Sequence, residues 1–322
     1  MAVYTEVCFE QAEAFVRSLG RGRVTALRGI GAGIENTNYF VSTDQGEWVL
    51  TLFERLSSEQ LPFYLRYMQH LARHGLPVPE PQADAQGCIL HLLCGKPAAL
   101  VNRLAGRHVL APELPHLQQM GEMLARLHLA GADFELRQPH LRGLDWWIAT
   151  VPEVLPFLDE ARAQRLRDEL AFQRGVAAGA AAAALPRGPI HADLFRDNVV
   201  FEAVDGADRL SGLFDFFFAG IDCLLFDVAV CLNDWCIDLH SGRLLEDRAT
   251  VFCDAYQRVR PFAGGEARLM PALLRAAAFR FWLSRLWDLH LPRDAALLQA
   301  KDPLHFERVL HDRIERPWHP LH

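Results

Sequence analysis

The stretch from Pro189 to Val200, PIHADLFRDNVV, concentrates acid/base and metal-binding groups between two apolar ends. A second apolar stretch, Gly212–Phe216, carries the acid Asp215. Phosphoryl transfer to an alcohol needs a carboxylate that orients the hydroxyl and accepts its proton, together with oxygen ligands for Mg²⁺. The spacing therefore predicts Asp193 as the base, and Asn198 and Asp215 as the metal ligands.

The alternative interpretation of Asp193 is an ordinary loop-capping acid, because a lone His-x-Asp is common by chance. The complete order of strand, loop with Asp and Asn, strand and later strand-end Asp is far more specific. The neighbouring polar residues are predicted to be structural. We expect His191 to hold the loop by hydrogen bonds, Asp197 to shape it, and the acid Asp227 to brace it around His191.

A glycine-rich segment, Gly29–Gly33, lies between two predicted strands. Glycines let a backbone approach phosphate oxygens without a Cβ clash, although glycine-rich hairpins are common in other settings. The phosphate-binding and plain-hairpin interpretations therefore both stand. The candidate phosphate contacts are Gly31, Gly33, Asn36, Thr37 and Asn38.

Two arginines, Arg280 and Arg285, lie in the aromatic stretch FRFWLSRLWD. Arginines in apolar surroundings require a carboxylate partner. Two interpretations remain open: a substrate carboxylate, or an acid of the protein, which would be Asp215, Asp222 or Asp288.

Hydrophobic periodicity predicts the elements that position these residues. The first hundred residues or so read as helices at 6–19 and 58–74 and strands at 23–30, 38–43, 47–53, 88–93 and 96–101. The rest is mainly helical, with helices at 116–130, 152–174, 180–184, 222–238, 244–259, 267–287 and 303–315. We therefore predict a small β-rich lobe at 1–103 and a larger helical lobe at 104–322, a groove between lobes being a common nucleotide site.

Composition narrows the class of protein. The net charge of −7, without a basic run, gives no attraction for nucleic acid or an anionic membrane. No run is long enough to cross a membrane, and the N-terminus lacks the basic segment of a signal peptide. Seven cysteines without a Cys-x-x-Cys pair suggest free thiols in a reducing compartment. We expect a cytoplasmic protein that acts on small molecules; the oligomeric state stays undetermined.

The loop, the later Asp, the glycine hairpin and the helical C-terminal part together resemble the aminoglycoside phosphotransferase/choline kinase group, which has a protein-kinase-like fold. Several stretches resemble its bacterial homoserine kinase branch more specifically. They extend from Gly33 to Asp288 and are GIENTNYFVSTDQGEWVLTLFE, LPFYLRYMQHLARHGLPVPEP, GKPAALVNRLAGR, RLHLAGADF, PIHADLFRDNVVF, LSGLFDFFFAG, DVAVCLNDWC and RFWLSRLWD.

This resemblance implies an α+β, kinase-like bilobal fold and ATP-dependent phosphorylation of L-homoserine to O-phospho-L-homoserine with Mg²⁺. Asp193 would be the base, Asn198 and Asp215 would bind Mg²⁺, and the Gly31–Asn38 hairpin would cover the phosphates. The adenine would meet the backbone near Val101–Leu104. The remaining candidates are Thr51 and Arg103 for ATP, and Arg280, Arg285 and Asp288 for the substrate.

One position departs from the wider kinase pattern. Thr51 stands where a strand Lys usually pairs the phosphates, as it commonly does in the homoserine branch, and the only lysine of this lobe is Lys96. Backbone amides, Mg²⁺, Asn36 or Arg196 would have to compensate. The alternative functions are a kinase of another small alcohol and an inactive kinase-like binding module, against which the intact Asp193 and its predicted metal ligands argue.

Overall fold

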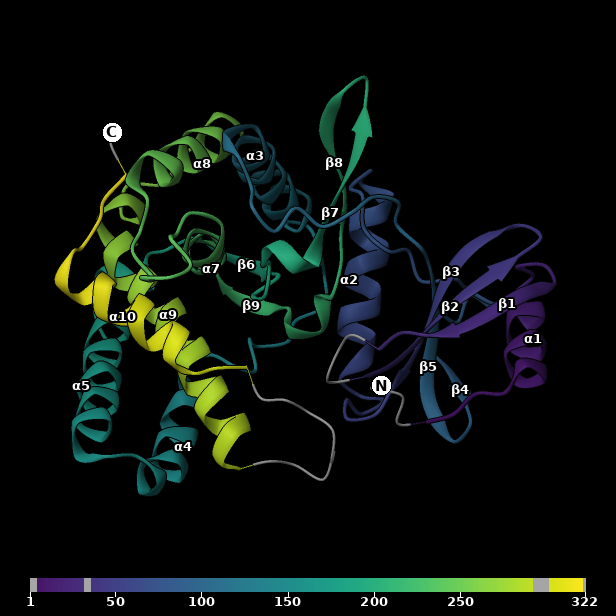
Figure 1. Cartoon of the computed structure of the whole chain (residues 1–322), viewed down its shortest axis with the longest axis horizontal. Helices are drawn as coiled ribbons and strands as arrows, with labels where there is room; N and C mark the ends of the chain where they lie inside the picture. Colours follow the sequence, from purple (N-terminus) through teal and green to yellow (C-terminus); the bar gives the residue numbers. More distant parts are fainter. Residues whose placement is uncertain (1–4, 32–35, 292–300, 321–322) are drawn as a thin grey trace. The chain divides into compact units, whose positions relative to one another are not determined.

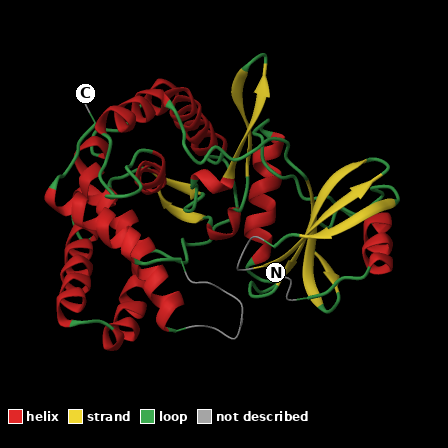
Figure 2. Ribbon diagram, in the orientation of Figure 1, coloured by secondary structure: helices red, strands yellow, loops and turns green. Residues whose placement is uncertain are grey.

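The computed structural model describes residues 5–31, 36–291 and 301–320. These residues form two compact units. Unit 1 comprises the described residues up to Ala105 together with Ser211–Phe214, and unit 2 comprises Gly106–Leu210 and the described residues from Asp215 onward. Figure 1 traces the elements along the chain, and Figure 2 shows that strands dominate unit 1 and helices dominate unit 2.

Unit 1 is built on an antiparallel five-stranded sheet with the order β1-β2-β3-β5-β4. A tight turn at Asp44–Gly46 joins β2 to β3, and Gly46 has φ +153°, in the positive-φ range that favours glycine. The strands are β1 (Val24–Gly29), β2 (Asn36–Thr43), β3 (Gly46–Phe53), β4 (His91–Leu93) and β5 (Lys96–Asn102).

The sheet has two chemically different faces because successive side chains alternate along a strand. The apolar face packs against α1 (Phe9–Ser18), with Val16, Tyr39 and Leu50 in the shared core. Asn38 and Thr51 lie in β2 and β3 directly opposite one another, so they share the other face. Helix α2 (Leu61–Arg73) belongs to the same unit and ends just before Gly75, at φ +76°.

Unit 2 is mainly helical, and its few strands form two short antiparallel ribbons that flank the functional loop. Its helices are α3 (Leu114–Ala130), α4 (Leu144–Val154), α5 (Glu160–Ala177), α6 (Ala180–Ala183), α7 (Leu224–Trp235), α8 (Glu246–Val259), α9 (Glu266–His290) and α10 (Leu304–Glu315). Strand β6 (Arg187–Ile190) pairs with β9 (Gly220–Cys223), and β7 (Val199–Val204) pairs with β8 (Ala207–Leu213), whose last residues belong to unit 1.

The predicted continuous helix at 152–174 is wrong. Helix α4 starts earlier and ends at Val154, a single 3₁₀ turn covers Leu155–Phe157, and α5 begins afresh at Glu160. Pro156, which has no N–H to continue a helix, lies in that turn. Asp159 then caps α5 by accepting a hydrogen bond from the Arg162 amide at 2.9 Å.

The cap makes a prediction about stability. Asp159→Ala should make the protein unfold at a lower urea concentration, because it leaves an amide of the first turn without its acceptor. The matched control is Asp168→Ala, which removes an exposed acid from the middle of the same helix. Urea denaturation of both variants measures the difference. Equal stability of the two would contradict the assignment of Asp159 as the cap.

The remaining elements lie where periodicity predicts them, within a few residues. All seven cysteines are free thiols, four of them buried and three exposed. Among the helices that the structure describes, none combines the length and the apolar character needed to cross a membrane.

Candidate active site

The functional loop, residues 191–198, connects β6 to β7 within unit 2. It is compact because two backbone hydrogen bonds fold it back on itself: the Phe195 amide donates to the Asp193 carbonyl, and the Asn198 amide donates to the Phe195 carbonyl, both at 2.9 Å. The second of these bonds belongs to a 3₁₀ turn at Arg196–Asn198, which leads directly into β7.

A buried carboxylate braces the start of this loop. The two oxygens of Asp227, on α7, accept the backbone amides of His191 and Ala192 at 2.7 and 2.8 Å. Ala192 has φ +64°, a left-handed conformation that costs a non-glycine residue about 1–2 kcal/mol, and these bonds help to hold it there. His191 Nδ1 accepts the Asp193 amide at 3.3 Å. The predicted structural roles of His191 and Asp227 are confirmed.

Arg196 anchors the other half of the loop. Its Nε donates to the Asp234 carboxylate at 3.0 Å, its Nη1 to the Leu110 carbonyl at 2.7 Å, and its Nη2 to the Asp234 carbonyl. The Asp234 carboxylate also accepts the Arg196 amide at 2.8 Å. These acceptors hold the Arg196 guanidinium to Leu110 and to α7, and its role as a substitute for the strand lysine stays a prediction. No sequence motif marks Asp234 as the partner of Arg196.

Asp193 has an environment suited to proton transfer. Burial raises the pKa of its carboxyl to about 7; Arg280 acts against this shift, and the charge of Asp215 adds to it. The Arg280 Nη1 lies 3.8 Å from Asp193 Oδ1, and the Asp193 side chain keeps 16% of its surface exposed. A base whose pKa lies near neutrality can accept a proton and release it again at physiological pH.

Asn198 and Asp215 supply the oxygen atoms that a hard cation prefers. The Asn198 amide nitrogen donates to the Asp193 carbonyl at 2.8 Å, and the side-chain oxygen Oδ1 is the atom that would bind a metal ion. Asp215 follows β8 in a left-handed conformation with φ +66° and lies close enough to raise the pKa of Asp193. The chemistry of this donor set fits Mg²⁺, and the assignment of the two ligands stays a prediction.

Arg280 lies directly beside Asp193, from α9. Its side chain is 3% exposed, and its guanidinium lies 3.8 Å from the Phe281 ring centroid and 5.0 Å from that of Phe218. Asp222, one of the protein partners considered for it, instead binds His140 and Arg187 at 3.1 and 3.0 Å. Asp193 is one carboxylate that the structure brings close to Arg280.

The other two substrate candidates lie further along α9. The Arg285 Nη1 donates to the Asp302 carbonyl at 2.9 Å, and its guanidinium lies 4.5 Å from the Phe306 ring centroid. Burial lowers the pKa of Arg285 to about 10, while nearby acids, including Asp193, act against that shift. Asp288, three residues further, is partly buried on the same helix.

A further cation near the base is Lys301, which no sequence motif identifies. Its Nζ lies 3.5 Å from the Asp197 carboxylate, and its charge lowers the pKa of Asp193. The sequence feature that could have pointed to Lys301 is the scarcity of lysine, because the chain has only two lysines. The other, Lys96, forms an ion pair with Glu54 at 3.1 Å within unit 1.

The nucleotide candidates of unit 1 divide between the two faces of its sheet. Asn38 and Thr51 share one face and are joined by a 2.7 Å hydrogen bond, and Asn36, two residues from Asn38, points to the same side. The Thr37 side chain points to the opposite face, where it donates to Glu54 at 2.8 Å. The structure therefore brings together Asn36, Asn38 and Thr51, but not the Thr37 side chain.

The other nucleotide candidates lie at the ends of strands. Gly31 is exposed just beyond β1, whereas Gly33 lies outside the described residues. Val101 pairs with Val49 across β5 and β3. Arg103 follows β5; its Nη1 lies 3.5 Å from Glu47 and its guanidinium 4.3 Å from the Phe40 ring centroid.

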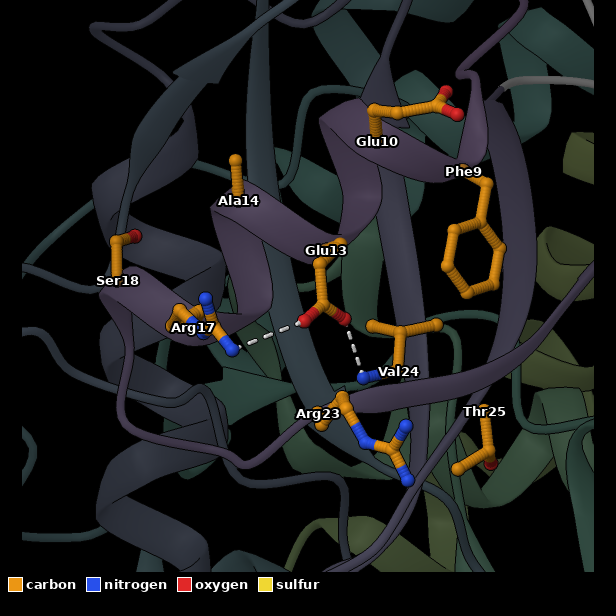
Figure 3. A pocket seen from close by; sticks show the side chains of 9 residues that line it. All are labelled: Phe9, Glu10, Glu13, Ala14, Arg17, Ser18, Arg23, Val24 and Thr25. Atoms are coloured by element: carbon orange, nitrogen blue, oxygen red, sulfur yellow. Dashed lines mark hydrogen bonds and ion pairs between the residues drawn. The ribbon is translucent and has the colours of Figure 1, made fainter.

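Unit 1 also has an open pocket of about 970 Å³ formed by α1 and β1 (Figure 3). Figure 3 shows Glu13 between two partners: it forms an ion pair with Arg17 at 3.6 Å and accepts the Val24 amide at 2.5 Å. None of the residues that line this pocket is a predicted site residue.

Known proteins resemble this chain in sequence and in fold. Residues 26–262 match the Phosphotransferase enzyme family. The chain is 60% identical to a homoserine kinase of Polaromonas naphthalenivorans over 99% of both chains, and 54% identical to one of Ralstonia nicotianae over 98% of this chain and 96% of the other.

Two solved structures resemble it in fold. An amicoumacin kinase in complex with AMP-PNP, Ca²⁺ and Ami superposes with a TM-score of 0.69 at 16% identity, covering 96% of this chain and 93% of the other. A Plasmodium vivax ethanolamine kinase superposes with a TM-score of 0.63 at 14% identity, covering 90% of this chain and 82% of the other. At such low identity the likeness shows the fold alone, which is the kinase-like α+β fold that the sequence predicts.

Proposed function

Because this chain belongs to the Phosphotransferase enzyme family and, within it, to the homoserine kinases, we propose that it transfers the γ-phosphoryl group of ATP to the side-chain hydroxyl of L-homoserine. The observation that carries the choice of substrate is the near-complete alignment with homoserine kinases at 50–60% identity. The partly buried Asp193, whose pKa is raised to about 7, supports the type of reaction.

Asp193 acts on the substrate hydroxyl in this proposal. Its carboxylate orients the hydroxyl and accepts its proton as the oxygen–phosphorus bond forms, while the bond from the γ-phosphorus to the bridging oxygen breaks and ADP leaves. The braced loop keeps this carboxylate in one position, which reduces the entropic cost of aligning the reacting groups. Asp227 and Arg196 therefore contribute by positioning the loop.

Asn198 and Asp215 would hold Mg²⁺, which when bound neutralises charge on the phosphates. Asn198 is well placed for this role because its own amide nitrogen is fixed to the loop carbonyl of Asp193. Asp215 would supply the charged ligand. The same carboxylate keeps the pKa of Asp193 high, so the metal ligand and the base are electrostatically linked.

The charges on α9 support a substrate that has both a carboxylate and an ammonium group. Arg285 and Asp288 are three residues apart, so they lie on one face of the helix and offer opposite charges. We assign Arg285 to the carboxylate and Asp288 to the ammonium group. Arg280 is also a candidate for the carboxylate, although it already lies beside Asp193.

The nucleotide assignments belong to unit 1. Asn36, Asn38 and Thr51 on one sheet face, together with the Gly31 backbone, are the proposed phosphate contacts, and Val101 and Arg103 are proposed to lie near the base and sugar. No lysine lies in β3, so polar side chains and backbone amides would provide the donors that the strand lysine supplies in other kinases.

A substrate panel tests the proposed function. Purified protein with Mg²⁺ and ATP should release ADP rapidly with L-homoserine, and at least a hundredfold more slowly with choline, ethanolamine or an aminoglycoside, which lack the carboxylate. Phosphorus NMR should identify a phosphate monoester on the side-chain oxygen. No turnover of homoserine, combined with turnover of another alcohol in the panel, would overturn the choice of substrate.

A further inference from the structure

A buried chain of polar side chains connects the functional loop to the turn between α8 and α9. Asp227, which holds the loop amides, lies 3.3 Å from Nε2 of His128 on α3. Nδ1 of the same histidine lies 2.7 Å from the hydroxyl of Tyr256 on α8. Arg260, at the end of α8, donates to that hydroxyl at 3.0 Å. The side chains of Asp227, His128 and Tyr256 are almost completely buried.

A second carboxylate fixes Arg260, the residue at the outer end of this row of polar side chains. Glu266, the first residue of α9, is fully buried and accepts hydrogen bonds from Arg260 at 3.1–3.2 Å and from the Ala263 amide at 2.7 Å. Arg260 can only donate hydrogen bonds, since a guanidinium has no acceptor atom. It is therefore a fixed donor, held at the α8–α9 turn and aimed at the Tyr256 oxygen.

This fixed donor determines the direction of the other hydrogen bonds between Arg260 and Asp227, which run through Tyr256 and His128. The Tyr256 oxygen accepts from Arg260, so the hydroxyl proton is left to donate to His128 Nδ1. A histidine that accepts at Nδ1 carries its proton on Nε2, and that N–H then donates to Asp227. A proton on Nδ1 instead would leave the Tyr256 proton without an acceptor in a buried site, which is costly.

We infer that Tyr256 is a positioning residue for the functional loop: its hydroxyl holds His128 in the Nε2–H tautomer, which keeps Asp227 oriented toward the amides of His191 and Ala192. The opposite tautomer would direct the Nε2 lone pair at the Asp227 carboxylate, and the repulsion would disturb the hydrogen bonds that hold the left-handed Ala192. Asp193 is the next residue after Ala192 in the sequence. The inference deepens the proposed function, since it assumes that this loop positions the base.

Tyr256→Phe is the primary test, because it removes the hydroxyl and keeps the buried ring. We expect kcat with homoserine to fall about tenfold, the effect of one buried hydrogen bond, while KM for homoserine and for ATP stays within about twofold. ¹⁵N and ¹³C histidine NMR should show the neutral Nε2–H form of His128 in the wild type and a mixture of tautomers in the variant. The amide resonances of residues 191–193 should shift with it.

Two further variants separate positioning from general destabilisation. Leu166→Val loosens the buried core of α5 in the same unit without touching the chain of polar side chains, and should leave kcat and the His128 tautomer unchanged. Arg260→Lys retains a cation that can only donate, so it should retain more activity than Arg260→Met. Activity ordered in this way, together with the tautomer change, supports the inference.

Three results would overturn it. These are an Nδ1–H or doubly protonated His128 in the wild-type protein, an unchanged kcat in Tyr256→Phe, and a kcat loss in Leu166→Val equal to that in Tyr256→Phe. The NMR measurements need no substrate. A failure of the homoserine assignment would therefore appear in the substrate panel, while a failure of the tautomer argument would appear in the spectra.

Discussion

Replacement of Asp193 by Asn should lower kcat for homoserine phosphorylation by about a thousandfold and leave KM for homoserine and ATP nearly unchanged. Asn has the same shape as Asp but cannot accept the hydroxyl proton, so the loss should fall on the transition state. Steady-state kinetics with Mg²⁺ and ATP measures both parameters.

The same variant should be more stable than the wild type at neutral and higher pH. The folded protein raises the Asp193 pKa from 3.8 to about 7, so the folded state binds this proton more tightly than the unfolded chain. Ionisation of Asp193 should therefore lower wild-type stability as the pH rises from about 4 to about 7. Above that range the free energy of unfolding of Asp193→Asn should exceed that of the wild type by on the order of 1 kcal/mol. Part of this gain is offset because Arg280 loses a carboxylate neighbour.

Asp197→Asn is the matched control for Asp193→Asn. Asp197 is an acid of the same loop, but its side chain is about half exposed and its carboxylate lies 3.5 Å from the Lys301 Nζ. We expect near-normal kcat and no gain in stability above pH 7. If Asp193→Asn keeps more than about a tenth of wild-type kcat, or if Asp197→Asn is equally impaired, Asp193 is not the base.

Asp215→Asn should raise the Mg²⁺ concentration needed for half-maximal activity by about a hundredfold and lower kcat at saturating Mg²⁺ by one or two orders of magnitude. Asn tolerates the left-handed conformation of Asp215 better than most residues, so the fold should be retained. The variant removes the negative charge of a ligand and keeps an oxygen donor. Removal of this charge should also lower the pKa of Asp193.

The experiment is a Mg²⁺ titration of activity, combined with calorimetry of ADP binding in the presence and absence of Mg²⁺. Asp222→Asn serves as the control, because it neutralises another partly buried acid of unit 2 that binds His140 and Arg187. The control should show the wild-type Mg²⁺ dependence, even if it is less stable. An unchanged Mg²⁺ dependence in Asp215→Asn would remove this residue from the metal site.

Much of the fold is predictable because its signals are local. The alternation of apolar side chains and the Asp44–Gly46 turn place β2 and β3 in the sequence to within a few residues, and the face of Leu117, Met120 and Leu124 does the same for α3. The loop with Asp193 and Asn198 is also local, since its residue types and their spacing follow one another in the chain. Such features need no knowledge of distant contacts.

Other features depend on residues far apart in the chain, and periodicity contains no information about them. The choice of Asp234 as the partner of Arg196 spans 38 residues, and the approach of Arg280 to Asp193 spans many more. The break between α4 and α5 is not visible in the periodicity, because Pro152 lies inside α4 and the new helix begins at the cap residue Asp159.

The sequence by itself therefore determined the class of this protein: a kinase-like α+β chain with an acid and an amide in one loop, and a second acid after a later strand, at the spacing of a phosphotransferase. Only the tertiary structure decided the partners of those groups. Partner choice depends on which side chains share a buried volume, and that volume forms only when helices from distant parts of the chain pack together. The path from Asp227 through His128 to Tyr256 shows this, since its three residues come from three separate helices.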